Sequence, residues 1–251
     1  MVVMRARRRN KITRLYKALR ALLFCLCIGT NQSVNASAGE IIKLKGDERI
    51  VFAGDSISAF GLSKRGYITL LEKQLRSQFK PQRFKFFDAG IVGNTSLDLV
   101  NRYERDVLSK KPGLVILYIG INDAVRCQPD AQSQHQAAIE YKNRLEYMVL
   151  AAQKKHALVL ICTPSVIDEQ SPGENKDDVI LDQLSDQARL VSAACNVPLC
   201  DLRKGFQNFL KTENPSNWKK GITTVDGIHL NDVGNRLVAQ LMLLNFGLKP
   251  R

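Results

Sequence analysis

The sequence predicts an α/β fold: a three-layer α/β/α architecture of the flavodoxin-like type, built on a five-stranded parallel sheet with strand order 2-1-3-4-5. Short apolar runs alternate with longer segments in which apolar residues recur at helical spacing. This alternation of strand and helix repeats five times, which favours parallel strands, right-handed crossovers and helices on both faces. With 251 residues, the chain is long enough for one such domain.

The first half of the chain carries three expected strands and two expected helices. The apolar run 50–53 is bounded by a charged segment and a glycine, which is typical of a buried strand. Segment 67–79 has apolar residues at helical spacing, and a proline marks its end. A phenylalanine-rich strand is expected at 84–90, and a helix at 97–107. The uninterrupted apolar run 114–119 predicts a strand covered on both faces.

The second half continues the alternation. The expected elements are, in order, helix 134–154, strand 158–163, helix 179–194, strand 197–202 and a final helix up to about residue 244. A proline ends the fourth strand, and residues 212–225 are expected to be irregular. Asn231 is a plausible N-cap of the final helix, because its side chain can accept from the first backbone amides.

The positive charge of the chain is concentrated at its N-terminus. The formal net charge is +13, but residues 1–38 contain eight lysines and arginines and no acidic residue. The remaining chain holds 29 basic and 24 acidic residues, a net charge of only +5. We therefore expect no nucleic-acid partner.

Residues 1–38 have the layout of a secretory signal peptide. The basic region is followed by the apolar run 21–29 and then by the small residues 36–38. The apolar run is shorter than the roughly 20 residues of a membrane-spanning helix. We expect cleavage before Gly39, a secreted or periplasmic protein, and one domain at 39–251. The alternative is an uncleaved N-terminal anchor, the only case in which a membrane would be involved.

Four cysteines remain in the expected mature chain. Export would permit disulfides, and Cys195 and Cys200 are the nearest pair in sequence. Cys162 lies in an apolar strand and Cys195 near a helix end, where a free cysteine acts as a small hydrophobic residue, and this interpretation is favoured. Cys127 is the fourth. No cysteine or histidine spacing is typical of a zinc site, so no metal is expected.

The polar residues that could carry chemistry follow the first three strands. In a 2-1-3-4-5 sheet a crevice forms at the C-terminal ends of strands 1 and 3. Gly54-Asp55-Ser56 follows strand 1, and Gly120-Ile121-Asn122-Asp123 follows strand 3. Strand 2 brings the segment 90–95 to the same edge. Ser56 is therefore the candidate nucleophile.

A serine nucleophile needs a general base and a group that orients the base. His135 lies among polar residues and His156 precedes the fourth strand at the opposite edge, so both are interpreted as surface residues. His229 lies three residues after Asp226 in a loop before a helix. This spacing lets Asp226 accept the Nδ1 proton and leaves Nε2 free to take the proton of Ser56.

Acyl transfer also needs hydrogen-bond donors for the developing oxyanion. The backbone N–H groups of Ser56 and Gly93 and the side-chain amide of Asn122 all belong to the segments at this edge. Gly93 suits the role because a residue without Cβ allows close approach of the substrate. Asp55 and Asp123 are interpreted as turn-forming or supporting residues, since a carboxylate beside an oxyanion would oppose catalysis.

These segments resemble, in order and spacing, the four blocks of the SGNH (GDSL) hydrolases: Gly54-Asp55-Ser56, Gly93 with Asn94 and Thr95, Asn122 with Asp123, and Asp226-x-x-His229. The resemblance implies Ser56 as nucleophile, Gly93 and Asn122 as oxyanion-hole residues, and His229 as base oriented by Asp226. It also implies an SGNH-hydrolase fold without metal or organic cofactor. Leu230 stands where some members have proline, and no Gly-x-Ser-x-Gly elbow is present.

The expected function is that of an exported serine esterase acting on a small-molecule or saccharide ester. The segments 59–66, 124–134 and 166–178 are polar and of modest length, which favours short acyl groups on a polar alcohol such as a sugar. An acyltransferase, lysophospholipase or thioesterase using the same site is an alternative. A catalytically inactive carbohydrate-binding domain is a more distant one.

Overall fold

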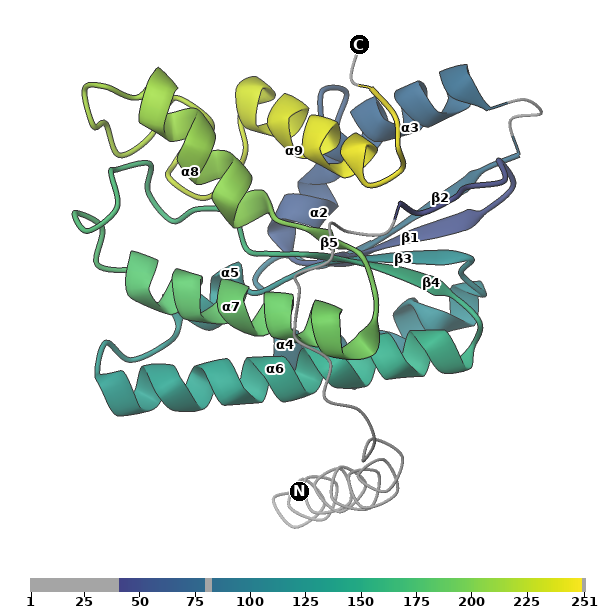
Figure 1. The fold of residues 1–251 in the computed structure, drawn as a ribbon, viewed down its shortest axis with the longest axis horizontal. Helices are drawn as coiled ribbons and strands as arrows, with labels where there is room; N and C mark the ends of the chain where they lie inside the picture. The colour runs from purple at the N-terminus through teal and green to yellow at the C-terminus, as the bar shows by residue number, and fades with distance from the viewer. Residues whose placement is uncertain (1–40, 80–82, 250–251) are drawn as a thin grey trace, which may run out of the picture. The chain divides into compact units, whose positions relative to one another are not determined.

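The computed structural model describes residues 41–79 and 83–249 and contains a five-stranded sheet in which all strand pairs are parallel (Figure 1). The strands are β1 (Arg49–Gly54), β2 (Lys85–Gly90), β3 (Leu114–Tyr118), β4 (Leu158–Cys162) and β5 (Leu199–Cys200). Their order is β2-β1-β3-β4-β5. The predicted fold class and strand order are confirmed. Residues 1–38, the expected signal peptide, lie outside the described residues.

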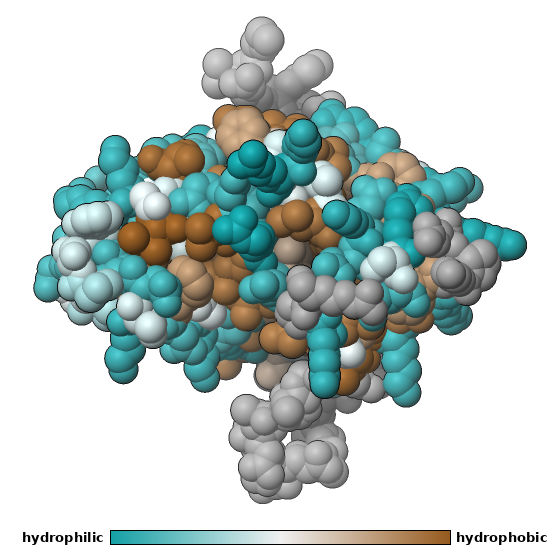
Figure 2. Space-filling model, turned by 90° about the horizontal axis from the view of Figure 1, so that it is seen from above, coloured by the Kyte–Doolittle hydropathy of each residue, from teal (hydrophilic) through white to brown (hydrophobic). Residues whose placement is uncertain are grey.

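Helices cover both faces of the sheet. One layer consists of α3 (Tyr67–Gln78), α8 (Leu202–Glu213) and α9 (Asp232–Leu244), and the other of α4 (Ser96–Asp106), α6 (Ala131–Lys154) and α7 (Asp178–Cys195) (Figure 1). Three short elements complete the described chain: α2 (Ser56–Gly61), α5 (Ile121–Val125) and the 3₁₀ turn Leu108–Lys110. Figure 2 looks onto the layer of α3, α8 and α9, where hydrophilic side chains interrupt smaller apolar areas. Within the described residues, no helix has the length and apolar character needed to cross a membrane.

The central strands are covered on both faces. Every residue of β3 is buried, and so is every residue of β1 after Arg49. On β1 the Phe52 ring packs against Tyr67 of α3 and Phe86 of β2, with centroids 6.0 and 6.4 Å apart. The buried Phe52–Tyr67 pair joins the sheet to the helical layer.

The strand register brings the chemically interesting segments to one edge. Gly54, the last residue of β1, is paired with Gly90 at the end of β2 and with Tyr118 at the end of β3. The three strands therefore end level with one another. The segments that follow these three strands therefore begin at the same edge of the sheet, as predicted from the sequence.

Helix α8 is absent from the sequence-based expectations, and β5 is shorter than expected. The strand expected at 197–202 ends at Cys200, because Asp201 accepts a hydrogen bond from the Lys204 N–H at 3.1 Å and starts a helix. Leu202, Phe206 and Leu210 are buried at helical spacing. This spacing and the aspartate cap are sequence signals that could have identified α8.

The four cysteines of the described chain are free. Cys162 and Cys200 are buried partners on neighbouring strands β4 and β5. Burial raises the pKa of the Cys162 thiol well above its usual range. The interpretation of Cys162 as a small hydrophobic residue therefore agrees with its position.

Candidate active site

Ser56 is placed where strand β1 turns directly into helix α2. The strand ends at Gly54, and the Asp55 side chain caps the helix by accepting from the Ile57 N–H at 3.0 Å. Ser56 is the first helical residue and only 5% exposed. A Cβ at Gly54 would lie 2.4 Å from the Tyr118 carbonyl oxygen, so this tight turn requires glycine.

Ser56, His229 and Asp226 form a continuous chain of hydrogen bonds. Nε2 of His229 lies 2.9 Å from Oγ of Ser56, and Nδ1 lies 2.7 Å from Oδ2 of Asp226. The other carboxylate oxygen, Oδ1, accepts from the backbone N–H groups of Ile228 and His229 at 3.0 and 2.8 Å. Although partial burial opposes it, these bonds lower the pKa of Asp226 to about 2. Asp226 is therefore a carboxylate at neutral pH and can hold the imidazole.

Asn122 of α5 is joined by a hydrogen bond to the segment that contains Gly93, and both residues follow strands that end level with β1. Gly93 has a φ of +77°, which favours glycine, and its carbonyl oxygen accepts from Arg126 at 2.6 Å. One N–H of the Asn122 amide is donated to the Asn94 carbonyl at 3.0 Å, which leaves the other available. Within the part of the chain that the structure describes, the Ser56 and Gly93 N–H groups have no acceptor. These groups can therefore donate to a ligand.

Asp55 and Asp123 are buried and support neighbouring segments. Asp123 accepts from the N–H and the hydroxyl of Ser96 at 2.8 and 2.5 Å, and Arg144 lies 3.6 Å away. Burial raises the pKa of Asp123, and it raises the pKa of Asp55 to about 7 even though the Ile57 amide opposes the shift. Asp123 thus links α5 to the start of α4, whereas Asp55 caps α2.

The other two histidines are exposed. His135 lies in the first turns of α6, and His156 follows the C-terminal end of the same helix. Neither makes a side-chain hydrogen bond to Ser56, Asp226 or His229. The interpretation of both as surface residues agrees with their exposure.

Two residues that contact His229 or Gly93, and a buried glutamate that contacts the segment before Asp226, were not identified from the sequence. The Phe60 ring lies 5.5 Å from the His229 ring between centroids, and Arg126 contacts the Gly93 carbonyl. Phe60 follows Ser56 by four residues, a helical spacing that would have revealed it had α2 been expected. Glu169 is buried and contacts residues at sequence separations of 53 to 55, so no local pattern identifies it.

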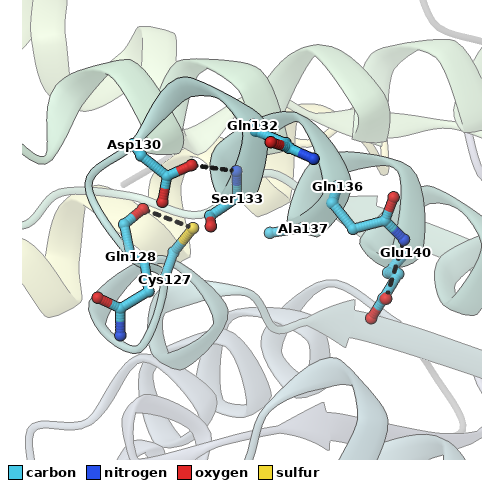
Figure 3. Close-up of a pocket in the computed structure, with 8 residues that line it drawn as sticks. All are labelled: Cys127, Gln128, Asp130, Gln132, Ser133, Gln136, Ala137 and Glu140. Carbon is cyan, nitrogen blue, oxygen red and sulfur yellow. Dashed lines mark hydrogen bonds between the residues drawn. The ribbon is translucent and has the colours of Figure 1, made fainter.

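A shallow polar pocket of about 410 Å³ lies at the start of α6 (Figure 3). Its lining residues come from the α5–α6 connection and from α6: Cys127, Gln128, Asp130, Gln132, Ser133, Gln136, Ala137 and Glu140. Several of these pair with one another, as Asp130 does with the Ser133 N–H at 2.8 Å. The pocket contains none of the residues in the Ser56–His229–Asp226 chain. Among the described residues, no group of three or more histidine, cysteine or acidic side chains could hold a metal ion.

Comparison with known proteins identifies related esterases. A model of the GDSL-like lipase/acylhydrolase family matches residues 52–237. Acetylxylan esterase from Geobacillus stearothermophilus is 27% identical over 221 residues, 82% of this chain and 97% of that enzyme. Esterase TesA from Pseudomonas aeruginosa is 30% identical over 131 residues, 51% of this chain and 60% of that enzyme. The crystal structure of the acetyl xylan esterase AlAXEase superimposes with a TM-score of 0.71 at 36% identity, covering 78% and 98% of the two chains.

The family match covers most of the described domain and includes the strand, turn and loop segments around Ser56. The relatives are named as esterases and share the three-layer architecture. The resemblance to the SGNH hydrolases is confirmed by this match. The chain therefore belongs to the GDSL-like lipase/acylhydrolase family and is a serine ester hydrolase with an SGNH-type fold.

Proposed function

We propose that the protein hydrolyses carboxylic esters with Ser56 as nucleophile, His229 as general base and Asp226 as the residue that orients His229. The observation that carries this proposal is the 2.9 Å contact between Ser56 Oγ and His229 Nε2, continued by the 2.7 Å contact between His229 Nδ1 and Asp226. A serine hydroxyl is a weak nucleophile alone, and an adjacent oriented base is the arrangement that activates it.

The proposed reaction has two halves. In the first, Ser56 Oγ bonds to the acyl carbon while its proton moves to His229 Nε2, and the alcohol leaves with that proton when the ester C–O bond breaks. In the second, water adds to the acyl carbon and gives its proton to His229. The bond to Ser56 Oγ then breaks, the serine regains its proton, and the acid is released.

The negative oxygen that forms in both halves needs donors. The N–H groups of Ser56 and Gly93 and the free N–H of the Asn122 amide are the proposed oxyanion hole. Their lack of acceptors among the described residues supports the proposal, because each is ready to donate to an incoming oxygen. Asp123 takes no part, since both of its oxygens accept from Ser96.

The proposed substrates are esters of short acyl groups with a polar alcohol, such as O-acetylated saccharides. Two relatives are named as acetylxylan esterases, which supports this class. A panel of acetylated xylo-oligosaccharides, short aryl esters, long-chain esters and acyl thioesters tests the class. Highest kcat/KM on long-chain esters or thioesters would contradict it.

We also propose that the protein is exported and cleaved before Gly39, with an N-terminal membrane anchor as the alternative. The basic N-terminus, the apolar run 21–29 and the small residues 36–38 support this proposal. N-terminal sequencing of the protein recovered outside the cytoplasm tests it. A mature N-terminus upstream of Gly39 would contradict the cleavage site.

Labelling with a fluorophosphonate probe tests the nucleophile directly. We expect the probe to modify Ser56 and a Ser56→Ala variant to remain unlabelled. Labelling at another serine would contradict the assignment.

A chain that binds saccharides but reacts with neither probe nor ester would instead be a binding domain. Product analysis in the presence of alcohol acceptors separates hydrolysis from acyl transfer.

A further inference from the structure

We propose that Glu169 is a positioning residue for Asp226 and His229, and that its buried carboxylate fixes the shape of the loop that carries them. The inference rests on the proposed function, because it assigns Glu169 a role toward the proposed base. Glu169 touches none of the three residues of the hydrogen-bonded chain. It acts through the segment 222–224, which ends two residues before Asp226 and leads into the loop.

The Glu169 carboxylate collects five hydrogen bonds from three consecutive residues. Oε1 accepts from the N–H and the hydroxyl of Thr223 at 2.7 and 2.8 Å and from the same groups of Thr224 at 2.6 and 2.7 Å. Oε2 accepts from the Ile222 N–H at 2.8 Å. Glu169 is 1% exposed, and both threonines are fully buried. These bonds give both oxygens of the buried carboxylate a hydrogen-bond donor and so compensate for its burial.

The segment 222–224, which is bonded to Glu169, continues into the backbone around His229. Thr224 forms an antiparallel bridge with Leu230, and the Val225 N–H donates to the His229 carbonyl at 2.8 Å. The hydroxyl of Thr224, which donates to Glu169, also accepts from the Gly227 N–H at 3.1 Å. The backbone at Thr224 and the backbone at His229 therefore lie side by side and run in opposite directions. A displacement of Thr224 would displace the imidazole.

The backbone of Glu169, in the connection that follows β4, is itself held by hydrogen bonds. The Glu169 N–H donates to the Lys219 carbonyl at 2.8 Å, and its carbonyl accepts from the Asn214 amide at 2.7 Å. The preceding residue, Asp168, donates its N–H to the Gly227 carbonyl at 2.9 Å and has a φ of +57°. A non-glycine residue in the left-handed region is uncommon, and such strain often lies near functional sites.

The chemistry of the donors explains why this position needs a carboxylate. Both oxygens face backbone N–H groups, which cannot reverse their direction as a hydroxyl can. A glutamine would point its own NH₂ group at one of these N–H groups and leave buried donors facing each other. Glu169→Gln should therefore disturb the segment 222–224 although it changes the volume of the side chain very little.

Thr223 provides a matched pair of variants that separates positioning from stability. Thr223→Val keeps the shape of the buried side chain but removes its hydroxyl bond to Glu169. Thr223→Ser keeps that bond but removes a buried methyl group, which should lower the melting temperature. The kcat and KM values for an aryl acetate and the thermal unfolding of both variants are compared with those of the wild type. Glu169→Gln is measured in the same way, with the exposed Glu174→Gln as its control.

We expect Thr223→Val to lower kcat about tenfold and Glu169→Gln about 10²-fold, with KM within about threefold, because small displacements of a base reduce the chemical step. Thr223→Ser and Glu174→Gln should keep the wild-type kcat within about threefold. Unchanged kcat in Thr223→Val, or kcat that follows melting temperature across all variants, would overturn the inference. If Glu169→Gln fails to fold, the Thr223 pair decides. Failure of the proposed function is a separate result, in which Ser56→Ala retains the wild-type activity.

Discussion

The Nε2 atom of His229 lies 2.9 Å from the Oγ atom of Ser56, and these residues flank the starts of two different helices. Ser56 is the first residue of α2, and His229 precedes the first residue of α9, Asp232, by three positions. The contact therefore depends on two separate turns. The first is fixed by the Asp55 cap at the end of β1, and the second by the bonds that surround Asp226.

Substitutions in this hydrogen-bonded chain should abolish or strongly reduce turnover. We expect Ser56→Ala to remove measurable hydrolysis of a short-chain aryl ester and His229→Ala to be similarly severe. Asp226→Ala should be milder if His229 keeps part of its orientation. Asp226 Oδ1 also accepts hydrogen bonds from two backbone N–H groups. Asp226→Asn can keep that oxygen in place while it changes the contact with the imidazole. This variant therefore separates the effect on the loop from the effect on the imidazole. Steady-state kinetics measure all four variants.

Circular dichroism and thermal unfolding provide the control for these four variants. Each should keep the fold, because Ser56→Ala removes only one oxygen atom from a buried side chain, and the side chains of His229 and Asp226 are partly exposed. Activity of Ser56→Ala above the uncatalysed rate, in a folded protein, would contradict its role as nucleophile.

The loss of the Asn122 amide should reduce the chemical step. If its free N–H stabilises the oxyanion, Asn122→Ala should lower kcat by about 10² to 10³ with little change in KM. Asn122→Asp has nearly the same size but presents no amide donor, and a carboxylate there would repel the oxyanion. We therefore expect it to be at least as inactive. Comparable kcat in wild type and Asn122→Asp would show that this side chain does not donate in the transition state.

Much of the fold could be predicted because its signals are local. The apolar runs at β1 and β3, the helical spacing of apolar residues in α3 and the cap at Asn231 are each visible within a few residues. The parallel order places the C-terminal ends of β1, β2 and β3 at the same edge of the sheet, so one common edge could be inferred for Ser56, Gly93 and Asn122.

The remaining features depend on contacts that no local pattern shows. Glu169 resembles any other acidic residue in a polar connection, and only the folded chain brings it to Thr223 and Thr224. The short helix α2 has a single turn and a half, too few residues for a periodic pattern to indicate it. Phe60 was missed for that reason. The expectation of polar surroundings for the site is therefore incomplete, because Phe60 is 53% exposed beside His229.

The stability of the protein should depend on the protonation of Asp55. Burial raises its pKa from 3.8 to about 7, so between about pH 4 and pH 7 the folded state holds a proton that the unfolded chain has lost. The free energy of unfolding should then fall as the pH rises through this range, by roughly 1.4 kcal/mol per pH unit from this group. Below the range the contribution is constant.

Asp55→Asn tests this linkage. Asparagine is as good an N-cap as aspartate, so the bond to the Ile57 N–H can be kept without the carboxyl group. Urea unfolding of both proteins at pH 5, 6, 7 and 8 should show the variant gaining stability relative to the wild type up to about pH 7 and then levelling. The exposed Asp47→Asn serves as the control. A stability difference that does not change with pH would contradict the protonation of Asp55.

Phe60 should contribute to substrate binding rather than to the chemical step. It lies one helical turn after Ser56 on the same face of α2, and its ring lies 5.5 Å from the His229 ring between centroids. A bound acyl or aryl group near Ser56 would cover part of this exposed ring, and the loss of such a contact costs about 1 to 2 kcal/mol. Phe60→Ala should therefore raise KM for an aryl butyrate about tenfold and change kcat by less than about threefold. Leu62→Ala removes a similarly exposed apolar side chain just beyond the same helix and should leave both values unchanged. An equal rise of KM in both variants would point to general surface hydrophobicity instead of a contact at Phe60.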